Sequence, residues 1–324
     1  MRVLVTGAAG FVGAAVSTAL LARGDQVVGI DNLNDYYDPA LKKARLARLE
    51  GSGFTFRQLD FADNLDLGEE SIDRIIHLGA QAGVRYSLVN PMAYARSNIV
   101  GHLNLLELAR ERAVPMVYAS SSSVYGGNTK LPFAVDDRTD HPVSLYAATK
   151  RADELMSETY AHLYRIPLTG LRFFTVYGPW GRPDMAPWLF TKAILSEVPI
   201  KVFNNGEMSR DFTYIDDIVA GILACNDRSP VDDHVKKPGG SVAPHAIYNI
   251  GNNRPEKLMR FIGLIEEATG KSAICDFQPM QPGDVPATYA DIDAIARDHG
   301  YKPTTPLDVG IPTFVNWFKS YHGI

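Results

Sequence analysis

The sequence has few cysteines, no long hydrophobic run and no excess of positive charge. Its two cysteines, Cys225 and Cys275, are too few for a disulfide framework and have no companions at the spacing of metal ligands. No apolar run reaches the roughly 18 residues that a transmembrane helix needs. The 32 lysines and arginines are outnumbered by 37 aspartates and glutamates, which gives a net charge of −5. We therefore expect no metal site, no membrane span and no binding of nucleic acid.

The apolar content is nevertheless high enough for a large folded core. Of the 324 residues, 46% are hydrophobic, and a chain of this length typically makes one large domain or two ordinary ones. The segment Met1–Leu21 carries an early arginine and many small apolar residues, as a signal peptide does. A strand, a glycine turn and a helix explain the same residues better, so the expected location is the cytoplasm.

Short apolar runs alternate with helical patterns through the first half of the chain. This alternation is typical of β-α-β units, which build a parallel sheet. The predicted strands are Arg2–Thr6, Gln26–Ile30, Phe54–Leu59, Ile72–Leu78, Met116–Ala119 and Leu168–Phe174. The predicted helices are Phe11–Arg23, Leu41–Glu50, Ala93–Arg112 and Leu145–Tyr164. After Tyr177, glycines and prolines interrupt regular structure, and residues 227–244 are typical of an exposed loop.

A glycine-rich turn joins the first predicted strand to the first predicted helix. Gly7, Gly10 and Gly13 allow, in that order, a tight turn, the close approach of a pyrophosphate and close packing of the helix on the strand. The N-terminus of the helix adds N–H donors and a partial positive charge. This arrangement predicts a dinucleotide site; the alternative is a purely structural turn.

Acidic and small residues at the ends of the next strands extend the predicted cofactor site. Asp31 ends the second strand about 20 residues after the glycines, where a carboxylate binds both ribose hydroxyls and repels a 2′-phosphate, so NAD is preferred over NADP. Asp60, with Phe61 beside it, suits the adenine edge, unless it is an ordinary aspartate of a turn. Further residues expected at the cofactor are Phe11, Val12, Asn32, Leu78, Ala80, Gln81 and Phe173.

These patterns together predict an α/β fold of the Rossmann type. We expect a doubly wound parallel sheet in an NAD-binding domain of residues 1–175 and a smaller mixed substrate domain of residues 176–324. The boundary is soft, because residues 212–250 can return to the first domain. A ligand cleft is expected between the two domains, at the carboxyl ends of the strands.

Tyr146 and Lys150 lie one helical turn apart in the segment YAATK. Hydride transfer at a sugar alcohol needs a base near neutral pH, and a free tyrosine is too weakly ionised. The lysine ammonium and the positive charge of a nicotinamide would stabilise the phenolate. The run Ser120–Ser123 can hydrogen-bond the reacting oxygen and share its proton with Tyr146, although serine-rich turns alone are usually only turns.

Seven segments of the chain resemble the extended short-chain dehydrogenase/reductase family. Within that family the resemblance is to the nucleotide-sugar epimerases, most closely to UDP-glucuronate 4-epimerases. The segments are Asp31–Leu46, Gly79–Ser87, Ser120–Gly126, His141–Lys150, Arg172–Ala186, Arg210–Ile218 and Gln281–Asp291. The resemblance implies tightly held NAD, a UDP-sugar substrate and a homodimer formed through the helices at 93–112 and 145–164.

The resemblance also implies roles for individual residues. Tyr146 takes the proton of the carbon-4 hydroxyl while hydride passes to NAD, Ser121 relays the proton, and Lys150 holds the nicotinamide ribose. The 4-keto sugar then rotates, and hydride returns to its other face, so no net redox change occurs. At the nucleotide, the family pattern implies a diphosphate contact from Arg210, a uracil side formed by Val202 and Phe203, and a further substrate contact from Asp284.

Two positions differ from the UDP-glucose/galactose epimerases, which have Asn where Thr175 stands and Arg where Gln281 stands. A different sugar is therefore expected, although those enzymes remain an alternative. A glucuronate needs donors for its carboxylate, and guanidinium and hydroxyl groups are suited to that role. The candidate donors are Arg85, Arg182, Ser122, Ser123 and Thr175.

Other reactions of the family need acidic groups that this chain lacks at the matching positions. The 4,6-dehydratases carry an Asp–Glu pair where Ser122 and Ser123 stand, and glucuronate decarboxylases carry Glu at the second of these positions. Non-catalytic NAD-binding relatives typically lose the tyrosine or the lysine. The favoured reaction is conversion of UDP-glucuronate to UDP-galacturonate, with decarboxylation and non-catalytic NAD binding as alternatives.

Overall fold

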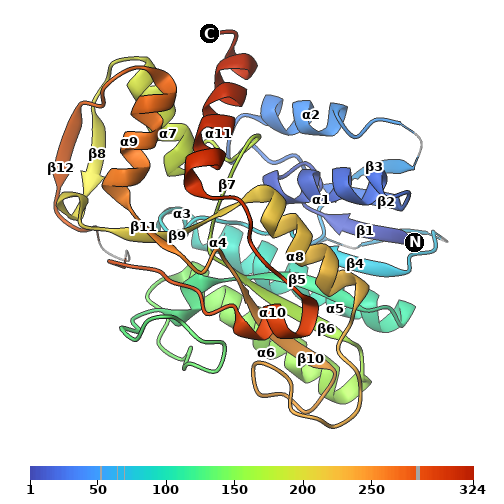
Figure 1. Ribbon diagram of the computed structural model, residues 1–324. Coiled ribbons are helices and arrows are strands. Elements are labelled where there is room, and N and C mark those ends of the chain that lie inside the picture. The colour runs from blue at the N-terminus through green and yellow to red at the C-terminus, as the bar shows by residue number, and fades with distance from the viewer. Residues whose placement is uncertain (52, 64, 69, 282–284) are drawn as a thin grey trace.

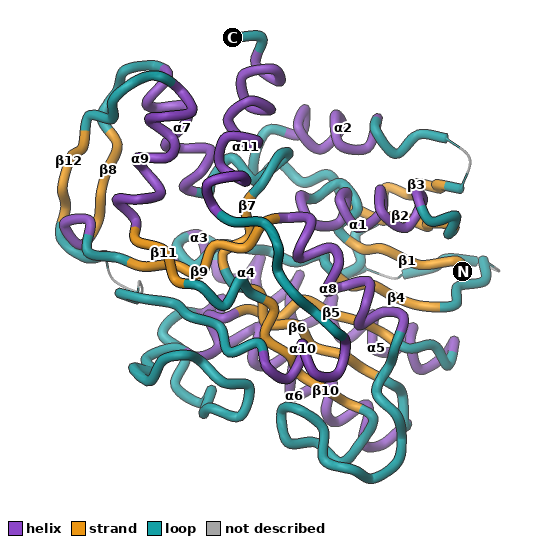
Figure 2. The backbone as a smooth tube through the Cα atoms, viewed as in Figure 1, coloured by secondary structure: helices purple, strands orange, loops and turns teal. Residues whose placement is uncertain are grey.

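The computed structural model describes residues 1–51, 53–63, 65–68, 70–281 and 285–324. A seven-stranded parallel sheet organises the first part of the chain, with the strand order β10-β6-β5-β4-β1-β2-β3 (Figures 1 and 2). The strands are β1 (Arg2–Thr6), β2 (Gln26–Asp31), β3 (Phe54–Gln58), β4 (Arg74–His77), β5 (Met116–Ser121), β6 (Leu168–Phe173) and β10 (His245–Ile250). The predicted α/β fold with a doubly wound parallel sheet is confirmed.

Helices cover both faces of the large sheet, and each face has its own hydrophobic core. Val3 and Val5 of β1 belong to the core that includes side chains of α1 (Phe11–Ala22) and α8 (Ile215–Asp227). Leu4, between them, belongs to the other core, which includes side chains of α5 (Gly101–Arg112) and α6 (Leu145–Tyr164). Because both faces are covered, the strands are nearly continuous apolar runs, which is the pattern that the sequence shows.

Two smaller sheets and the C-terminal helices make up the second part of the chain. One sheet has the order β11-β9-β7, and the other pairs β12 with β8. The strands are β7 (Thr175–Tyr177), β8 (Ile200–Phe203), β9 (Ser209–Tyr214), β11 (Pro255–Lys257) and β12 (Cys275–Gln278), and the helices are α7 (Ala186–Leu195), α9 (Leu258–Thr269), α10 (Asp293–His299) and α11 (Leu307–His322). Between β9 and β11 the chain re-enters the large sheet, since β10 pairs with β6.

The prediction of one regular helix at Ala93–Arg112 is wrong. The structure divides this stretch into α4 (Pro91–Tyr94), a π-helical turn at Ala95–Val100 and α5. Such insertions are rare, they have no clear compositional signature, and they often occur at functional sites. The short helix α3 (Tyr86–Val89) precedes this stretch.

The second helix begins earlier than predicted. It is α2 (Pro39–Ala47), and its N-cap residue is Asp38, whose Oδ1 accepts a hydrogen bond of 2.8 Å from the N–H of Ala40. An aspartate followed by proline is a strong start signal, because the side chain caps a free N–H and proline is tolerated in the first turn.

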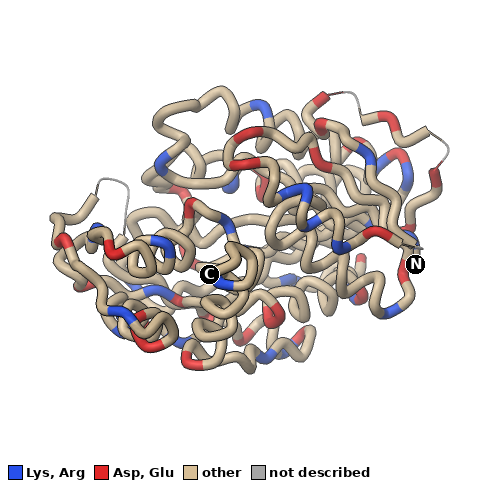
Figure 3. The backbone as a smooth tube through the Cα atoms, turned by 90° about the horizontal axis from the view of Figure 1, so that it is seen from above, with Lys and Arg blue, Asp and Glu red and all other residues tan. Residues whose placement is uncertain are grey.

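Charge is spread widely over the molecule. Figure 3 shows acidic and basic residues interspersed along the chain rather than separated onto two faces. Within the described ranges, no helix combines the length and the apolar character needed to cross a membrane.

Candidate functional site

A cleft of about 1240 Å³ lies at the carboxyl ends of the central strands and is lined by both parts of the chain. It brings together most of the residues predicted for the site. These are Gly7, Gly10, Phe11, Val12, Gly13, Asp31, Asn32, Phe61, Leu78, Ala80, Gln81, Arg85, Ser121, Ser122, Ser123, Tyr146, Lys150, Phe173, Thr175, Arg182, Phe203 and Arg210. The predicted residues Asp60 and Val202 are not part of this lining, and Asp284 lies outside the described residues.

The glycine-rich turn leaves no room for side chains. A Cβ atom at Gly13 would lie 2.0 Å from the carbonyl oxygen of Gly7, and one at Gly10 would lie 2.9 Å from the same oxygen. Gly7 has a φ of +68°, a conformation that other residues rarely adopt. The turn therefore brings bare backbone to the cleft at the N-terminus of α1. Amides in that position suit the pyrophosphate of a dinucleotide.

Asp31 is held in place by the backbone around it. Its Oδ2 accepts a hydrogen bond of 3.2 Å from the N–H of Ala9, and its Oδ1 accepts one of 2.8 Å from the N–H of Leu33. These bonds orient the carboxylate at the cleft, where its remaining lone pairs can accept hydrogen bonds from ribose hydroxyls. The glycine turn and Asp31 together fit NAD.

Asp60, predicted at the adenine edge, is bonded to residues beside the cleft and is not part of the cleft lining. Its Oδ2 accepts a hydrogen bond of 3.1 Å from the side chain of Asn32 and lies 3.3 Å from Arg96. Its Oδ1 accepts the N–H of Ala62 at 2.9 Å, as in an ordinary turn. The structure thus gives Asp60 a supporting place next to Asn32, while Phe61 lines the cleft.

Helix α6 places Tyr146 and Lys150 in the cleft. The helix starts at a serine cap, since Ser144 Oγ accepts the N–H of Ala147 at 3.1 Å. Lys150 Nζ donates to the carbonyl of Ala119, within β5, and to Asp153 Oδ2, each at 3.0 Å. The lysine is therefore fixed against the strand that carries the serine run.

The four serines 120–123, the last two residues of β5 and the two that follow it, divide into two groups. Ser120 Oγ donates to Glu154 Oε1 at 2.7 Å, so its side chain is held in the protein interior. Ser121 Oγ accepts the N–H of Ser123 at 3.2 Å and donates to Ser123 Oγ at 3.1 Å. The hydroxyls of Ser121, Ser122 and Ser123 are the ones available as proton carriers or donors in the cleft.

A buried ion pair that the sequence analysis missed supports this part of the site. Glu154 accepts two hydrogen bonds from Arg172, at 2.8 and 2.9 Å, and both side chains are at most 2% exposed. Burial opposes the charge on each partner, but the pairing outweighs it, so the pKa of Glu154 is lowered and that of Arg172 is raised. Glu154 follows Lys150 by one helical turn, but it pairs with Arg172 of β6, a partner that only the tertiary fold reveals.

Two residues near the π-helical turn hold the loop after β4 and were also missed. Asn98 accepts the N–H of Gln81 at 2.9 Å and donates to the carbonyl of Gln81 at 3.1 Å. Tyr94 Oη donates to the carbonyl of Ala82 at 2.9 Å, and its ring meets that of Tyr146 edge to face at 6.0 Å. These contacts fix the loop and the catalytic tyrosine candidate relative to each other.

Arg182 faces the cleft in a bidentate ion pair. Its Nε donates to Asp184 Oδ1 at 3.0 Å, its Nη2 contacts Oδ2 of the same residue, and Tyr36 Oη donates to that Oδ2 at 3.0 Å. Burial raises the pKa of Asp184, but Arg182 and Tyr36 overcome this effect and the net pKa is lowered. An anionic ligand at Arg182 would therefore compete with Asp184.

Arg85, a predicted carboxylate donor, lies against Phe203, which is predicted at the uracil side. The guanidinium carbon of Arg85 lies 5.0 Å from the centre of the Phe203 ring. Arg210 Nη1 donates to the carbonyl of Ser209 at 2.9 Å. Val202, predicted at the uracil side, is fully buried in the hydrophobic core, because alternate residues of β8 point to opposite faces.

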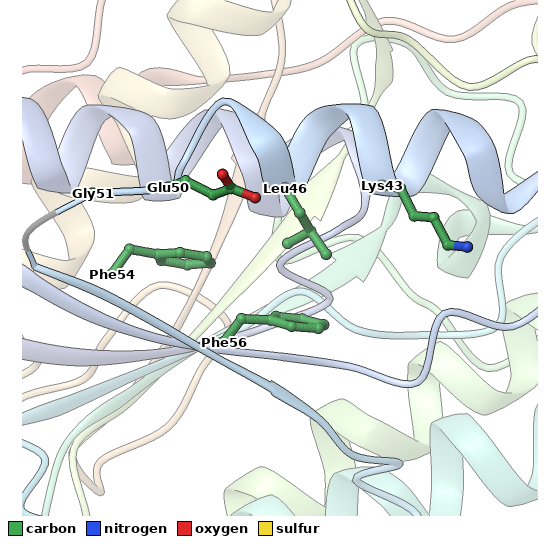
Figure 4. Close-up of a pocket in the computed structure, with 6 residues that line it drawn as sticks. All are labelled: Lys43, Leu46, Glu50, Gly51, Phe54 and Phe56. Carbon is green, nitrogen blue, oxygen red and sulfur yellow. The ribbon is translucent and has the colours of Figure 1, made fainter.

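A second hollow lies at the edge of the large sheet, between α2 and β3 (Figure 4). It measures about 390 Å³, and the figure shows Phe54 and Phe56 below Leu46 of α2. Lys43 and Glu50 are its charged side chains, and they come from opposite ends of the hollow. The polar groups do not converge there as they do in the large cleft. No group of His, Cys, Asp or Glu in the described part of the chain could hold a metal ion.

Comparison with known proteins agrees with this geometry. The profile of the NAD dependent epimerase/dehydratase family matches residues 3–251. The chain belongs to this family. The predicted cofactor, NAD, is confirmed by this membership.

Several members of the NAD dependent epimerase/dehydratase family are similar to this chain over nearly its whole length. UDP-glucuronate 4-epimerase 4 of Arabidopsis thaliana is 49% identical, over 99% of this chain and 76% of its own length. Protein CapI of Staphylococcus aureus is 49% identical, over 99% of both chains. The structure of UDP-glucuronic acid 4-epimerase from Bacillus cereus with UDP-glucuronic acid and NAD has a TM-score of 0.90 and 33% identity, covering 99% of this chain and 100% of that one.

Proposed function

We propose that this protein is an NAD-dependent UDP-sugar 4-epimerase that converts UDP-glucuronate to UDP-galacturonate. The observation that carries the proposal is one cleft that holds Tyr146, Lys150 and Ser121 together with the cationic Arg182. The first three supply proton transfer at a hydroxyl, and Arg182 supplies a partner for a carboxylate. The similarity to UDP-glucuronate 4-epimerases supports the same substrate.

In the proposed mechanism, Tyr146 as a phenolate takes the proton of the carbon-4 hydroxyl. NAD, held by the glycine-rich turn and Asp31, would supply reversible hydride transfer at that carbon, with removal from one face and return to the other. Ser121 hydrogen-bonds the reacting oxygen and relays the proton, while Lys150 holds the ribose hydroxyls and stabilises the phenolate. Between the two half-reactions the 4-keto sugar rotates within the cleft.

The oxidised intermediate of a glucuronate is a β-keto acid, which loses carbon dioxide readily. Arg182, together with the hydroxyls of Ser122, Ser123 and Thr175, would retain the carboxylate, because its charge is stabilised beside a fixed guanidinium. The hydroxyls of Ser122 and Ser123 cannot act as the acids that a dehydratase or a decarboxylase uses. The cleft therefore favours epimerisation without loss of the carboxylate.

A UDP-glucose/galactose 4-epimerase is the second candidate. The structure of UDP-glucose 4-epimerase from Thermotoga maritima with UDP-glucose has a TM-score of 0.86 and 27% identity, covering 99% of this chain and 100% of that one. A neutral hexose would leave Arg182 paired with Asp184, as it is in this structure. A uronate would offer Arg182 a second carboxylate, so the proposal requires the ligand to replace Asp184 as the partner of Arg182.

We further propose that residues 1–175, with 212–250, form the NAD-binding domain and that residues 176–324 supply the substrate domain.

We also propose that the protein forms a homodimer through α5 and α6. Exposed leucines on these helices support it, since Leu103 is 39%, Leu155 is 53% and Leu163 is 60% exposed.

The test is incubation of the purified protein with UDP-glucuronate, UDP-glucose, UDP-galactose and UDP-xylose, with the products resolved by NMR. We expect UDP-galacturonate from UDP-glucuronate and slow or no turnover of the neutral sugars. Faster turnover of UDP-glucose would favour the second candidate. Release of a UDP-pentose and carbon dioxide as the main products would identify a decarboxylase.

A further inference from the structure

Lys150 has a buried carboxylate partner that the proposed mechanism does not use. Its Nζ lies 3.0 Å from Asp153 Oδ2, and the two side chains are 3% and 0% exposed. Among the described residues, Oδ1 of Asp153 has no hydrogen-bond partner. The pair is therefore shielded from water, and each charge acts strongly on its neighbours.

The other titratable groups around Asp153 are either neutral or committed elsewhere. On α6, Glu154 is paired with Arg172 of β6. His77 of β4 and His102 of α5 are fully buried, and burial lowers the pKa of both, His77 to about 3. On β5, burial raises the pKa of Tyr118 well above its ordinary value, so that group stays neutral. Lys150 is thus the cation that faces Asp153.

We propose that Asp153 is a positioning residue that holds Lys150 against β5 and offsets part of the ammonium charge that stabilises the Tyr146 phenolate. The geometry serves both roles, because Lys150 donates at once to Ala119 and to Asp153. The inference rests on the proposed roles of Tyr146 and Lys150. It adds to the proposed mechanism one carboxyl group, that of Asp153, whose charge state affects the proposed base Tyr146.

The effect of Asp153 on the Tyr146 phenolate depends on pH, because Asp153 itself titrates. Burial raises that pKa to about 7, in spite of the opposing effect of Lys150. Below this pH the carboxyl is protonated and the lysine charge acts fully on Tyr146. Above it the carboxylate opposes the lysine, so further ionisation of the tyrosine becomes harder. Turnover should therefore rise with pH over a wider range than a single ionisation would give.

The test compares pH profiles of turnover for the wild type and Asp153→Asn, with whichever UDP-sugar the protein converts. The amide keeps the shape of the side chain and removes its charge. We expect the acidic limb of the profile to move down by about one pH unit and to narrow to a single ionisation. Bound NAD should be unchanged. Glu158→Gln, on the same helix but bonded to His245, is the matched control and should leave the profile as it is.

An Asp153→Asn variant with the same midpoint and width but uniformly lower turnover would show that Asp153 only packs, and would overturn the proposal. If that variant fails to fold, the pH profile of the wild type provides the test. A wild-type profile as narrow as a single ionisation would also overturn the proposal. Failure of the proposed function is seen separately, as absence of turnover with every UDP-sugar or as full activity of Tyr146→Phe.

Discussion

The two walls of the cleft are built in different ways. The cofactor wall is made mainly of backbone, since Gly7, Gly10 and Gly13 cannot carry a side chain and Asp31 is oriented by two amides. The substrate wall is made of side chains that bind one another, as in the pair of Arg182 with Asp184. The first wall is fixed by the fold, whereas in the proposed function the second exchanges a protein partner for a ligand. We therefore expect substrate specificity to reside in the second wall.

One buried arginine links the two walls. Arg45 of α2 is fully buried and donates to the carbonyl of Ala9 in the glycine-rich turn at 3.1 Å. It also donates to the carbonyls of Trp180 and Gly181, at 2.7 and 3.1 Å, just before Arg182. The loop that carries Arg182 is thus attached to the rigid cofactor wall.

The largest effect is expected at Tyr146, the proposed general base. Tyr146→Phe should retain NAD but lose at least about a hundredfold in turnover, because the general base is removed. Steady-state turnover and the NAD content of the purified variant are the measurements. Tyr160→Phe removes a hydroxyl from the same helix far along its length and should change little. Turnover near that of the wild type in Tyr146→Phe would exclude the tyrosine as the base.

The substrate wall should respond to Arg182→Leu in a way that depends on the sugar. The KM for UDP-glucuronate should rise by about ten- to a hundredfold, the value of one or two charged hydrogen bonds. Binding of UDP-glucose should change little, and the fraction of decarboxylated product per turnover should increase. Arg138→Leu removes an exposed arginine paired with Asp140 and serves as the control. Unchanged kinetics and carbon dioxide release would make Arg85 the carboxylate-binding candidate.

The substitution Asp31→Ala, in the cofactor wall, should affect only the binding of the cofactor. We expect weaker NAD binding by about tenfold or more and a smaller preference for NAD over NADP, since the ribose acceptor and the negative charge are both lost. Equilibrium titration of cofactor-depleted protein measures both quantities. Asp35→Ala, in the exposed loop that follows, is the control. An unchanged ratio of the two affinities would mean that another group reads the ribose.

The smallest effect concerns stability and Asp153. Because its pKa in the folded protein is raised to about 7, its contribution to stability is present at low pH and is lost as the pH rises through that value. The difference in unfolding free energy between Asp153→Asn and the wild type should therefore increase from about pH 5 to about pH 7, by at most about 1.4 kcal/mol per pH unit. Denaturant unfolding at several pH values measures it. A difference that is constant with pH would show that the carboxyl titrates normally.

The sequence predicted the cofactor wall better than the substrate wall, and the reason is distance along the chain. The glycines and Asp31 belong to one local β-α-β unit, and α6 runs from Leu145 to Tyr164, as predicted. The pairing of Arg182 with Tyr36 through Asp184 joins residues far apart in sequence, which only the tertiary fold reveals. The spacing of Lys150 and Asp153 is visible in the sequence, but such pairs usually lie on the surface, and burial alone gives this one its effect.

The most direct test of epimerisation through a 4-keto sugar uses UDP-glucuronate that carries deuterium at carbon 4. NMR of the product from the purified protein shows where the deuterium resides. We predict UDP-galacturonate with the deuterium kept at carbon 4 and no net NADH, because the hydride leaves and returns within one closed cleft. Loss of the deuterium to water, or product formed without inversion at carbon 4, would contradict the mechanism.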